Sequence, residues 1–180
     1  MKEREHYTPG PAAGATVQKN GEEWTLVIVR ELRHSTERVW QALTDPTELR
    51  EWAPFDASSS LAILGSAGRL TTVGAQKPVV SEVTVTRAEA PNVLEYNWGE
   101  NIMRWELEAT GEGTRLTLWH SIDQRYIAMG AAGWHICLDV LDHLLGGTPL
   151  GRIVAGEAMK FGWPRLHEEY AAQFGVETTQ

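Results

Sequence analysis

The order of the expected secondary structure elements constrains the fold of this 180-residue chain more than any other feature. One strand comes first over Trp24–Arg33, two short helices follow, strands then succeed one another from about Ser58 to Ile122, and a long helix begins near Gly130. A sheet that meets its first strand late in the chain and then receives a lone amphipathic helix tends to wrap around that helix. We therefore expect an α+β domain with an internal pocket between sheet and helix.

The two short helices carry specific start signals. Ser35 is suited to cap a helix over Thr36–Thr44, in which Val39, Trp40 and Leu43 form an apolar stripe. The next helix starts with the motif Asp45-Pro46-Thr47-Glu48, which combines a capping aspartate, a proline at the first helical position and a glutamate able to reach back. It is expected to end before Pro54.

Turn residues divide the middle of the chain into further strands, because glycine, proline and asparagine favour tight turns. The expected strands are Ser60–Leu64, Gly68–Gly74, Val79–Arg87, Val93–Trp98, Asn101–Ala109 and Thr114–Ile122.

Two turns predict the register of the last three strands. If Gly99-Glu100 forms a two-residue turn and Thr110–Gly113 forms the next loop, directly opposed residues share one face of the sheet. The outer face then places Glu95 beside Arg104 beside Trp119, an arrangement typical of a solvent-facing surface, and we expect Arg104 to stack on Trp119 and to form an ion pair with Glu95. The interior face carries Leu94, Tyr96, Met103, Trp105, Leu107, Leu116, Leu118 and His120.

The long helix supplies the matching apolar surface. Its inward stripe contains Trp134, Cys137, Leu138, Leu141, Leu144 and Leu145. His135, Asp139 and Asp142 are expected on the opposite, solvated side, and Gly146-Gly147 ends the helix. A last short helix is expected over Pro164–Phe174. The segment Thr148–Phe161 either covers the pocket mouth or forms a dimer contact, and monomer and homodimer both stay open.

Composition narrows the class of protein and its partners. The formal net charge of −8 disfavours nucleic acid and anionic membrane surfaces as partners. The lone cysteine, Cys137, excludes an internal disulfide and is typical of a cytoplasmic protein. No stretch of the sequence is long and apolar enough to cross a bilayer. We expect residues 1–22 to form a flexible tail and residues 23–176 to form one domain.

Several motifs resemble one known family. TERVWQALTDPTELREWAPF (Thr36–Phe55), AGRL (Ala67–Leu70), GEGTRLTL (Gly111–Leu118), GWHICLDVL (Gly133–Leu141) and GWPRLHEEYAAQFG (Gly162–Gly175) are similar to the Hsp90-ATPase-activator-homologue branch of the Bet v 1/START-like superfamily. The resemblance implies a helix-grip fold, in which a curved antiparallel sheet encloses a cavity against a long C-terminal helix. That superfamily includes lipid and hormone binders, polyketide cyclases and co-chaperone domains, so the fold alone does not select a function.

The interior face and the long helix together suggest a ligand pocket. Its expected lining is Tyr96, Met103, Trp105, Leu118, His120, Trp134, Leu138 and Leu141. Tyr96 and His120 would orient a ligand there, although a packed core in which they satisfy each other is equally compatible with the pattern.

Catalytic and metal-binding interpretations have little support in the sequence. We favour a structural or ligand-contacting role for His120 over a general base, since no carboxylate shares its expected face. His135, Asp139 and His143 are spaced four apart, but eight residues of helix turn too far round the axis for three ligands to converge. We therefore assign no catalytic residue, no metal and no cofactor.

Three functional hypotheses follow. The first is a non-enzymatic binder of a small hydrophobic or aromatic ligand, and the second is a protein-interaction module that resembles a co-chaperone domain and contacts a chaperone or another protein. The third is an enzyme of the cyclase or hydrolase type, in which His120 and Tyr96 act as acid–base groups.

Overall fold

The computed structural model describes residues 2–74 and 76–178. The strands are β1 (Ala15–Asn20), β2 (Glu23–Leu32), β3 (Phe55–Ala57), β4 (Ala67–Thr72), β5 (Val79–Glu89), β6 (Val93–Trp98), β7 (Asn101–Thr110) and β8 (Gly113–Ser121). The α-helices are α1 (Lys2–His6), α2 (Thr36–Thr44), α3 (Pro46–Trp52), α4 (Ile127–Leu145) and α5 (Trp163–Phe174), and the 3₁₀ helices are η1 (Gln124–Tyr126) and η2 (Ala155–Phe161).

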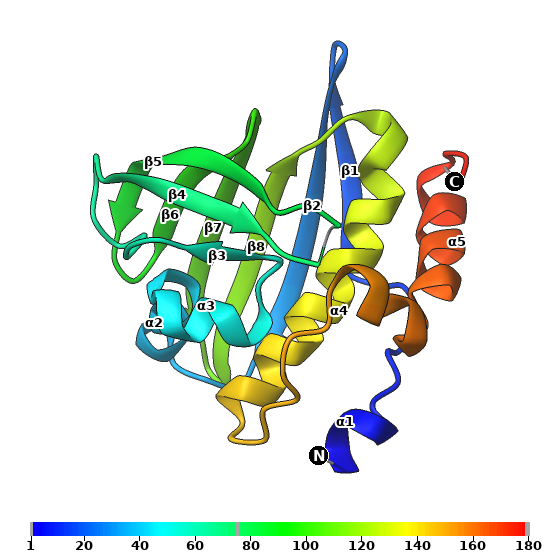
Figure 1. The fold of residues 1–180 in the computed structure, drawn as a ribbon, viewed down its shortest axis with the longest axis horizontal. Helices are drawn as coiled ribbons and strands as arrows, with labels where there is room; N and C mark the ends of the chain where they lie inside the picture. The colour runs from blue at the N-terminus through cyan, green and yellow to red at the C-terminus, as the bar shows by residue number, and fades with distance from the viewer. Residues whose placement is uncertain (1, 75, 179–180) are drawn as a thin grey trace.

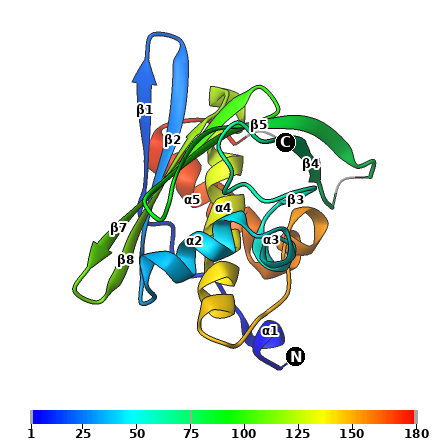
Figure 2. The ribbon, with the colours of Figure 1, turned by 90° about the vertical axis from the view of Figure 1, so that its left-hand side faces the viewer.

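The strands of the described residues form one antiparallel sheet of eight, in the order β1-β2-β8-β7-β6-β5-β4-β3. The sheet curves around α4, which lies along its concave side (Figures 1 and 2). The first long strand, β2, pairs with the last strand, β8, as the element order requires. The predicted α+β helix-grip architecture is confirmed.

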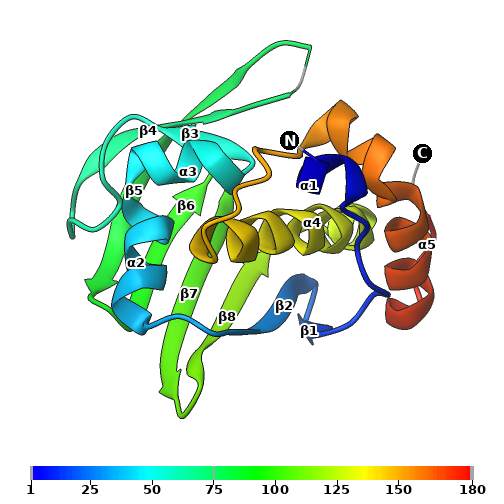
Figure 3. The ribbon, with the colours of Figure 1, turned by 90° about the horizontal axis from the view of Figure 1, so that it is seen from below.

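Helices α2 and α3 start where their sequence signals predict. The Ser35 hydroxyl accepts a hydrogen bond from the Arg38 amide at 3.2 Å, and the Asp45 carboxylate accepts one from the Thr47 amide at 2.8 Å. Both helices pack against the concave side of the sheet beside α4 (Figure 3), where Trp52 is fully buried. This placement fills one end of the space between the sheet and α4.

The predicted register of the last three strands is confirmed. Met103 lies opposite both Tyr96 and His120, and Trp105 lies opposite both Leu94 and Leu118. These six residues are all buried. The interior face of the sheet is therefore the one that the two turns predict.

One detail of the outer face differs from the prediction. Arg104 lies opposite Glu95, and its guanidinium stacks on the Trp119 ring at 4.3 Å, as expected. Its ion pair, however, is with Glu106 on its own strand at 3.3 Å. The Glu95 carboxylate instead accepts a hydrogen bond from the Thr86 hydroxyl at 2.9 Å on the other neighbouring strand.

The prediction of a strand at Ser60–Leu64 is wrong. Residues 61–65 form turns, and the short strand β3 lies earlier in the chain, where Phe55 and Ala57 are buried. Leu61 is buried, whereas Ile63 and Leu64 are 61% and 65% exposed. The local apolar content therefore reflects one anchoring side chain and not a strand that alternates between two faces.

The segment predicted to be a flexible tail, residues 1–22, contains a strand; residue 1 of this segment lies outside the described residues. Residues 15–20 form β1, which pairs along its length with β2 and adds an edge strand to the sheet. The preceding residues are held by side chains that bind their backbone, including Arg165, whose guanidinium donates to the Pro9 carbonyl at 2.6 Å. Composition does not predict these contacts because the anchoring side chains lie about 150 residues away.

The side of α4 that was expected to face solvent is covered around His135 and Asp139, whereas Asp142 is exposed, as predicted. β2 and α5 pack against it, and His135 is only 5% exposed, with its Nδ1 at 2.6 Å from the Tyr170 hydroxyl oxygen. The Asp139 carboxylate accepts hydrogen bonds from the Arg30 guanidinium and from the Tyr7 hydroxyl. In residues 2–74 and 76–178, no three histidine, cysteine or acidic side chains are grouped as metal ligands.

None of the helices within these described ranges combines the length and the apolar character needed to span a membrane.

Candidate functional site

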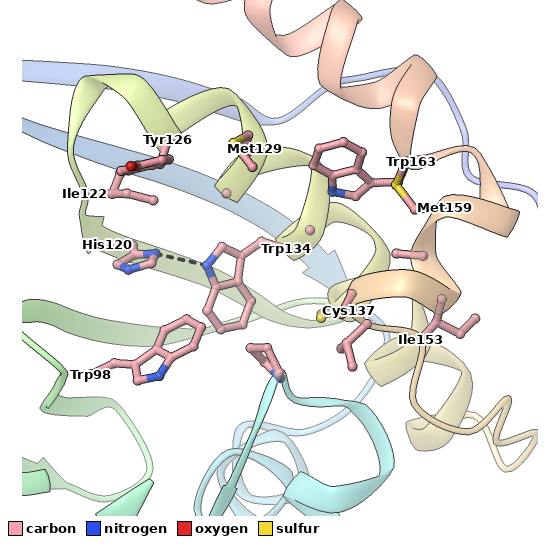
Figure 4. A pocket seen from close by; sticks show the side chains of 16 residues that line it. Trp98, His120, Ile122, Tyr126, Met129, Trp134, Cys137, Ile153, Met159 and Trp163 are labelled. Atoms are coloured by element: carbon pink, nitrogen blue, oxygen red, sulfur yellow. Dashed lines mark hydrogen bonds between the residues drawn. The ribbon is translucent and has the colours of Figure 1, made fainter. Parts of the chain in front are cut away.

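A cavity of about 440 Å³ lies between the sheet, α4, η2 and the start of α5 (Figure 4). Its lining is almost entirely apolar or aromatic. The lining residues are Pro54, Trp98, His120, Ile122, Tyr126, Met129, Gly130, Gly133, Trp134, Cys137, Ile153, Val154, Ala155, Ala158, Met159 and Trp163. Tyr126 and Met159 are 46% and 53% exposed, so the cavity opens to solvent beside them.

Helix α4 makes room for the cavity with glycine. Gly133 lies one helical turn before Cys137 and next to Trp134, on the part of α4 that faces the cavity. A Cβ atom at Gly133 would meet no atom within 4 Å, whereas one at Gly130 would lie 2.9 Å from Cδ1 of Ile122. The open space therefore begins at the backbone of α4 around Gly133.

The cavity wall contains a buried polar side chain, His120, in addition to the phenol of Tyr126 at the opening. The Trp134 indole N–H donates to Nδ1 of His120 at 3.0 Å (Figure 4). Because an indole N–H can only donate, Nδ1 is the accepting nitrogen and the imidazole hydrogen lies on Nε2. The ring also stacks on Trp98, with centroids 5.8 Å apart.

Burial determines the charge state of His120. Its side chain is 3% exposed, and this desolvation lowers its pKa from 6.5 to about 4. The imidazole is therefore neutral near pH 7. In the part of the chain that the structure describes, no group hydrogen-bonds its Nε2, which is itself buried. His120, a residue of the cavity wall, thus carries a neutral and buried N–H donor that has no partner among the described residues.

Cys137 is the other reactive side chain of the lining. Burial raises the pKa of its thiol to about 12, so the thiol stays protonated at neutral pH. Among the described lining residues there is no carboxylate to serve as an acid or base. The chemistry of the wall therefore suits binding, since it provides neither a thiolate nucleophile nor a charged proton acceptor.

The wall formed by residues 153–159 is held from both sides. On one side, Nη1 of Arg4 donates to the carbonyls of Leu150, Gly151 and Arg152 at 3.0, 2.9 and 3.2 Å. On the other side, the Arg152 guanidinium binds the Asp56 carboxylate at 2.6 Å. The segment 148–161 thus covers the cavity, which is one of the two roles that the sequence left open.

The structure separates the eight predicted pocket residues into two groups. His120 and Trp134 line the cavity, as predicted. The other six are buried in the core between the sheet and α4 and do not line it: Tyr96, Met103, Trp105, Leu118, Leu138 and Leu141.

Aromatic side chains from α3 and β3 explain this separation. Trp52 packs edge-on against Trp105, with ring centroids 6.0 Å apart, and Phe55 packs in the same way against Tyr96 at 6.2 Å. The Trp105 indole donates to the Tyr96 hydroxyl oxygen at 3.0 Å. The Tyr96 hydroxyl therefore accepts a hydrogen bond from Trp105, and Tyr96 does not line the cavity, where the prediction placed it.

Several lining residues were not predicted. Trp98 follows Tyr96 by two positions on the same strand, so the alternation of strand faces contained the signal for it. Met129 lies before the expected start of α4, because the helix begins at Ile127 and not near Gly130. Met159 and Trp163 come from a segment without a periodic apolar pattern, so no sequence signal identifies them as lining residues.

A curved antiparallel sheet closed around one long helix, with a cavity between them, defines a helix-grip protein. The sequence model of the family described as "Activator of Hsp90 ATPase homolog 1-like protein" matches residues 33–146. The chain therefore belongs to this family, as its motifs indicated. A search of curated proteins gave no match.

Solved structures share the fold. A conserved protein of unknown function from Enterococcus faecalis, EF2215, is 19% identical with a TM-score of 0.67, and the match covers 88% of this chain and 89% of that one. CalU16 from Micromonospora echinospora is 23% identical with a TM-score of 0.65, covering 92% and 98%. MLL2253 from Mesorhizobium loti is 24% identical with a TM-score of 0.60, covering 69% and 98%. At these identities the likeness establishes the fold and not a shared function.

Proposed function

We propose that this protein binds a small apolar molecule in the cavity between the sheet, α4 and η2. The observation that carries the proposal is the cavity itself, with a volume of about 440 Å³ and an apolar and aromatic lining. Ligand pockets typically enclose roughly 300–1,000 Å³ and combine a mostly apolar wall with a few placed polar groups. The cavity fits this description, with His120 as a placed polar group.

The glycine at the cavity wall supports a binding role. Glycine inside a helix lowers helix stability by about 1 kcal/mol relative to alanine, so Gly133 does not stabilise α4. The position nevertheless leaves space that a Cβ atom would enter without meeting another atom within 4 Å. Space retained at a cost in stability is what a binding site requires and what a packed core avoids.

Binding fits the lining better than catalysis does. The enzyme hypothesis assigned acid–base roles to His120 and Tyr96, but the Tyr96 hydroxyl is buried outside the cavity and bonded to Trp105. Burial also raises the pKa of Tyr96, which keeps the phenol protonated. We therefore propose binding without turnover as the activity of this site.

Native mass spectrometry of the purified protein tests the proposal. We expect a stoichiometric small molecule that is released on denaturation, or 1:1 uptake of an added aromatic probe such as 2-acetylnaphthalene. The variant Gly133→Leu should lose this species because its side chain enters the cavity, whereas Trp119→Ala on the outer face should keep it. Equal occupancy in Gly133→Leu and the unchanged chain would contradict the assignment of the site.

A further inference from the structure

We infer that the cavity selects an uncharged aromatic molecule bearing a hydrogen-bond acceptor, such as a ketone carbonyl, and that His120 recognises this acceptor. The inference rests on the proposed function and names the chemical class of its ligand. It combines three features of the wall. These are the fixed tautomer of His120, the lack of charged side chains among the described lining residues, and the aromatic and thioether side chains that border the cavity.

The first feature is the fixed tautomer of His120. Trp134 donates to Nδ1 at 3.0 Å, so the imidazole can offer only a donor at Nε2. That N–H is buried and, within the described residues, has no partner. A buried donor without an acceptor is unfavourable, and because His120 lines the cavity, we take an acceptor group on the bound ligand as the missing partner. A ligand that carries an acceptor meets this requirement.

The second feature is the charge of the wall. The described lining contains no lysine, arginine or carboxylate, and His120 itself is neutral near pH 7. Arg152, next to the lining residue Ile153, is already bound to Asp56 at 2.6 Å. A carboxylate or ammonium group buried here would lose its hydration without gaining a counter-ion. The ligand is therefore uncharged where it contacts the wall.

The third feature is the shape and polarisability of the wall. Three indole rings, those of Trp98, Trp134 and Trp163, border the space together with the thioethers of Met129 and Met159 (Figure 4). Indole faces and edges pack well against flat rings, and methionine sulfur makes favourable contacts with aromatic groups. This combination favours a planar aromatic ligand.

Three matched probes separate these requirements. They are 2-acetylnaphthalene, which is aromatic and carries a neutral acceptor, 2-ethylnaphthalene, which has the same shape without the acceptor, and 2-naphthoate, which is anionic at pH 7. Isothermal titration calorimetry with the full chain should give about tenfold tighter binding for the ketone than for the ethyl compound, the range of one buried hydrogen bond. Binding of 2-naphthoate should be weaker than that of the ketone.

Two variants test the role of His120. In His120→Gln, the amide oxygen can accept from Trp134 while the amide N–H donates to the ligand, so the preference for the ketone should persist. In His120→Phe, the ketone and ethyl compounds should bind equally. Because His120→Phe leaves the Trp134 N–H unpaired and is prone to unfold, nitrogen NMR of the unchanged chain gives a second readout. It should show hydrogen on Nε2 and a shift of that nitrogen when the ketone binds.

The outcomes distinguish this inference from the proposed function. If the ketone and ethyl probes bind equally well to the unchanged chain and Gly133→Leu abolishes both, the cavity binds ligands but His120 does not select them. Tighter binding of 2-naphthoate than of the ketone would overturn the uncharged ligand class. If none of the three probes binds, the proposed function fails together with the inference.

Discussion

The substitution Gly133→Ala separates the stability of α4 from the function of the cavity. Gly133 lies within the helix, and a Cβ atom there meets nothing within 4 Å. Alanine removes the entropic cost of a helical glycine without a steric penalty, so the free energy of unfolding should rise by about 1 kcal/mol. For a domain of this size the midpoint of thermal unfolding should rise by about 2–4 °C.

Gly130→Ala is the matched control, because it makes the same change one turn earlier on the same helix. Its Cβ would lie 2.9 Å from Cδ1 of Ile122, so that side chain has to move and the gain should be smaller or absent. Urea denaturation of the two variants, followed by circular dichroism, measures the difference. A destabilised Gly133→Ala variant, or equal effects at both positions, would refute the claim that the space begins at Gly133.

Three further predictions concern the walls of the cavity. Tyr96→Phe leaves the buried Trp105 N–H without its acceptor, so it should cost about 1–3 kcal/mol in urea denaturation while the affinity for 2-acetylnaphthalene stays within about twofold. Acid should destabilise the fold between pH 6.5 and 4. The folded chain has a His120 pKa of about 4, so over this range the unfolded chain binds a proton at His120 and the folded chain does not. At roughly 1.4 kcal/mol per pKa unit, this difference lowers the free energy of unfolding by about 3 kcal/mol. Arg4→Ala should increase amide hydrogen exchange over residues 150–157, because the side chain donates to three carbonyls of that segment.

Each of these three predictions has a control variant or an outcome that would contradict it. For Tyr96→Phe, a loss of affinity for 2-acetylnaphthalene larger than the loss of stability explains would show that Tyr96 contacts the ligand. For the pH dependence, His120→Gln should flatten the slope only in part, since burial also lowers the pKa of His135; an unchanged slope would contradict the assignment. For Arg4→Ala, the comparison is Arg87→Ala, whose exposed ion pair with Glu89 should leave exchange over residues 150–157 unaffected.

The sheet was predictable from the sequence because its signals are local. Glycine turns of known length determine the register, so the pairing of Met103 with His120 follows from counting residues. The capping residues Ser35 and Asp45 likewise place α2 and α3. The prediction failed at β1, where pairing with β2 orders a segment whose own composition suggests flexibility.

The cavity was only partly predictable. Sequence pattern identifies which residues face inward, but it does not say which inward residues are covered by other side chains. Trp52 and Phe55 fill the space beside Trp105 and Tyr96, and this displaces the open volume toward Trp98 and His120. The η2 wall is held by distant contacts such as those of Arg4, which no local pattern encodes.

Fluorine NMR of protein labelled with 5-fluorotryptophan tests the central claim most directly, because the eight tryptophans report on both the cavity and the rest of the molecule. On titration with 2-acetylnaphthalene, the resonances of Trp98, Trp134 and Trp163 should shift and saturate at one equivalent, while that of Trp119 on the outer face should stay unchanged. Shifts confined to Trp119, or no saturable shift at the three cavity residues, would contradict the assignment of this cavity as the binding site.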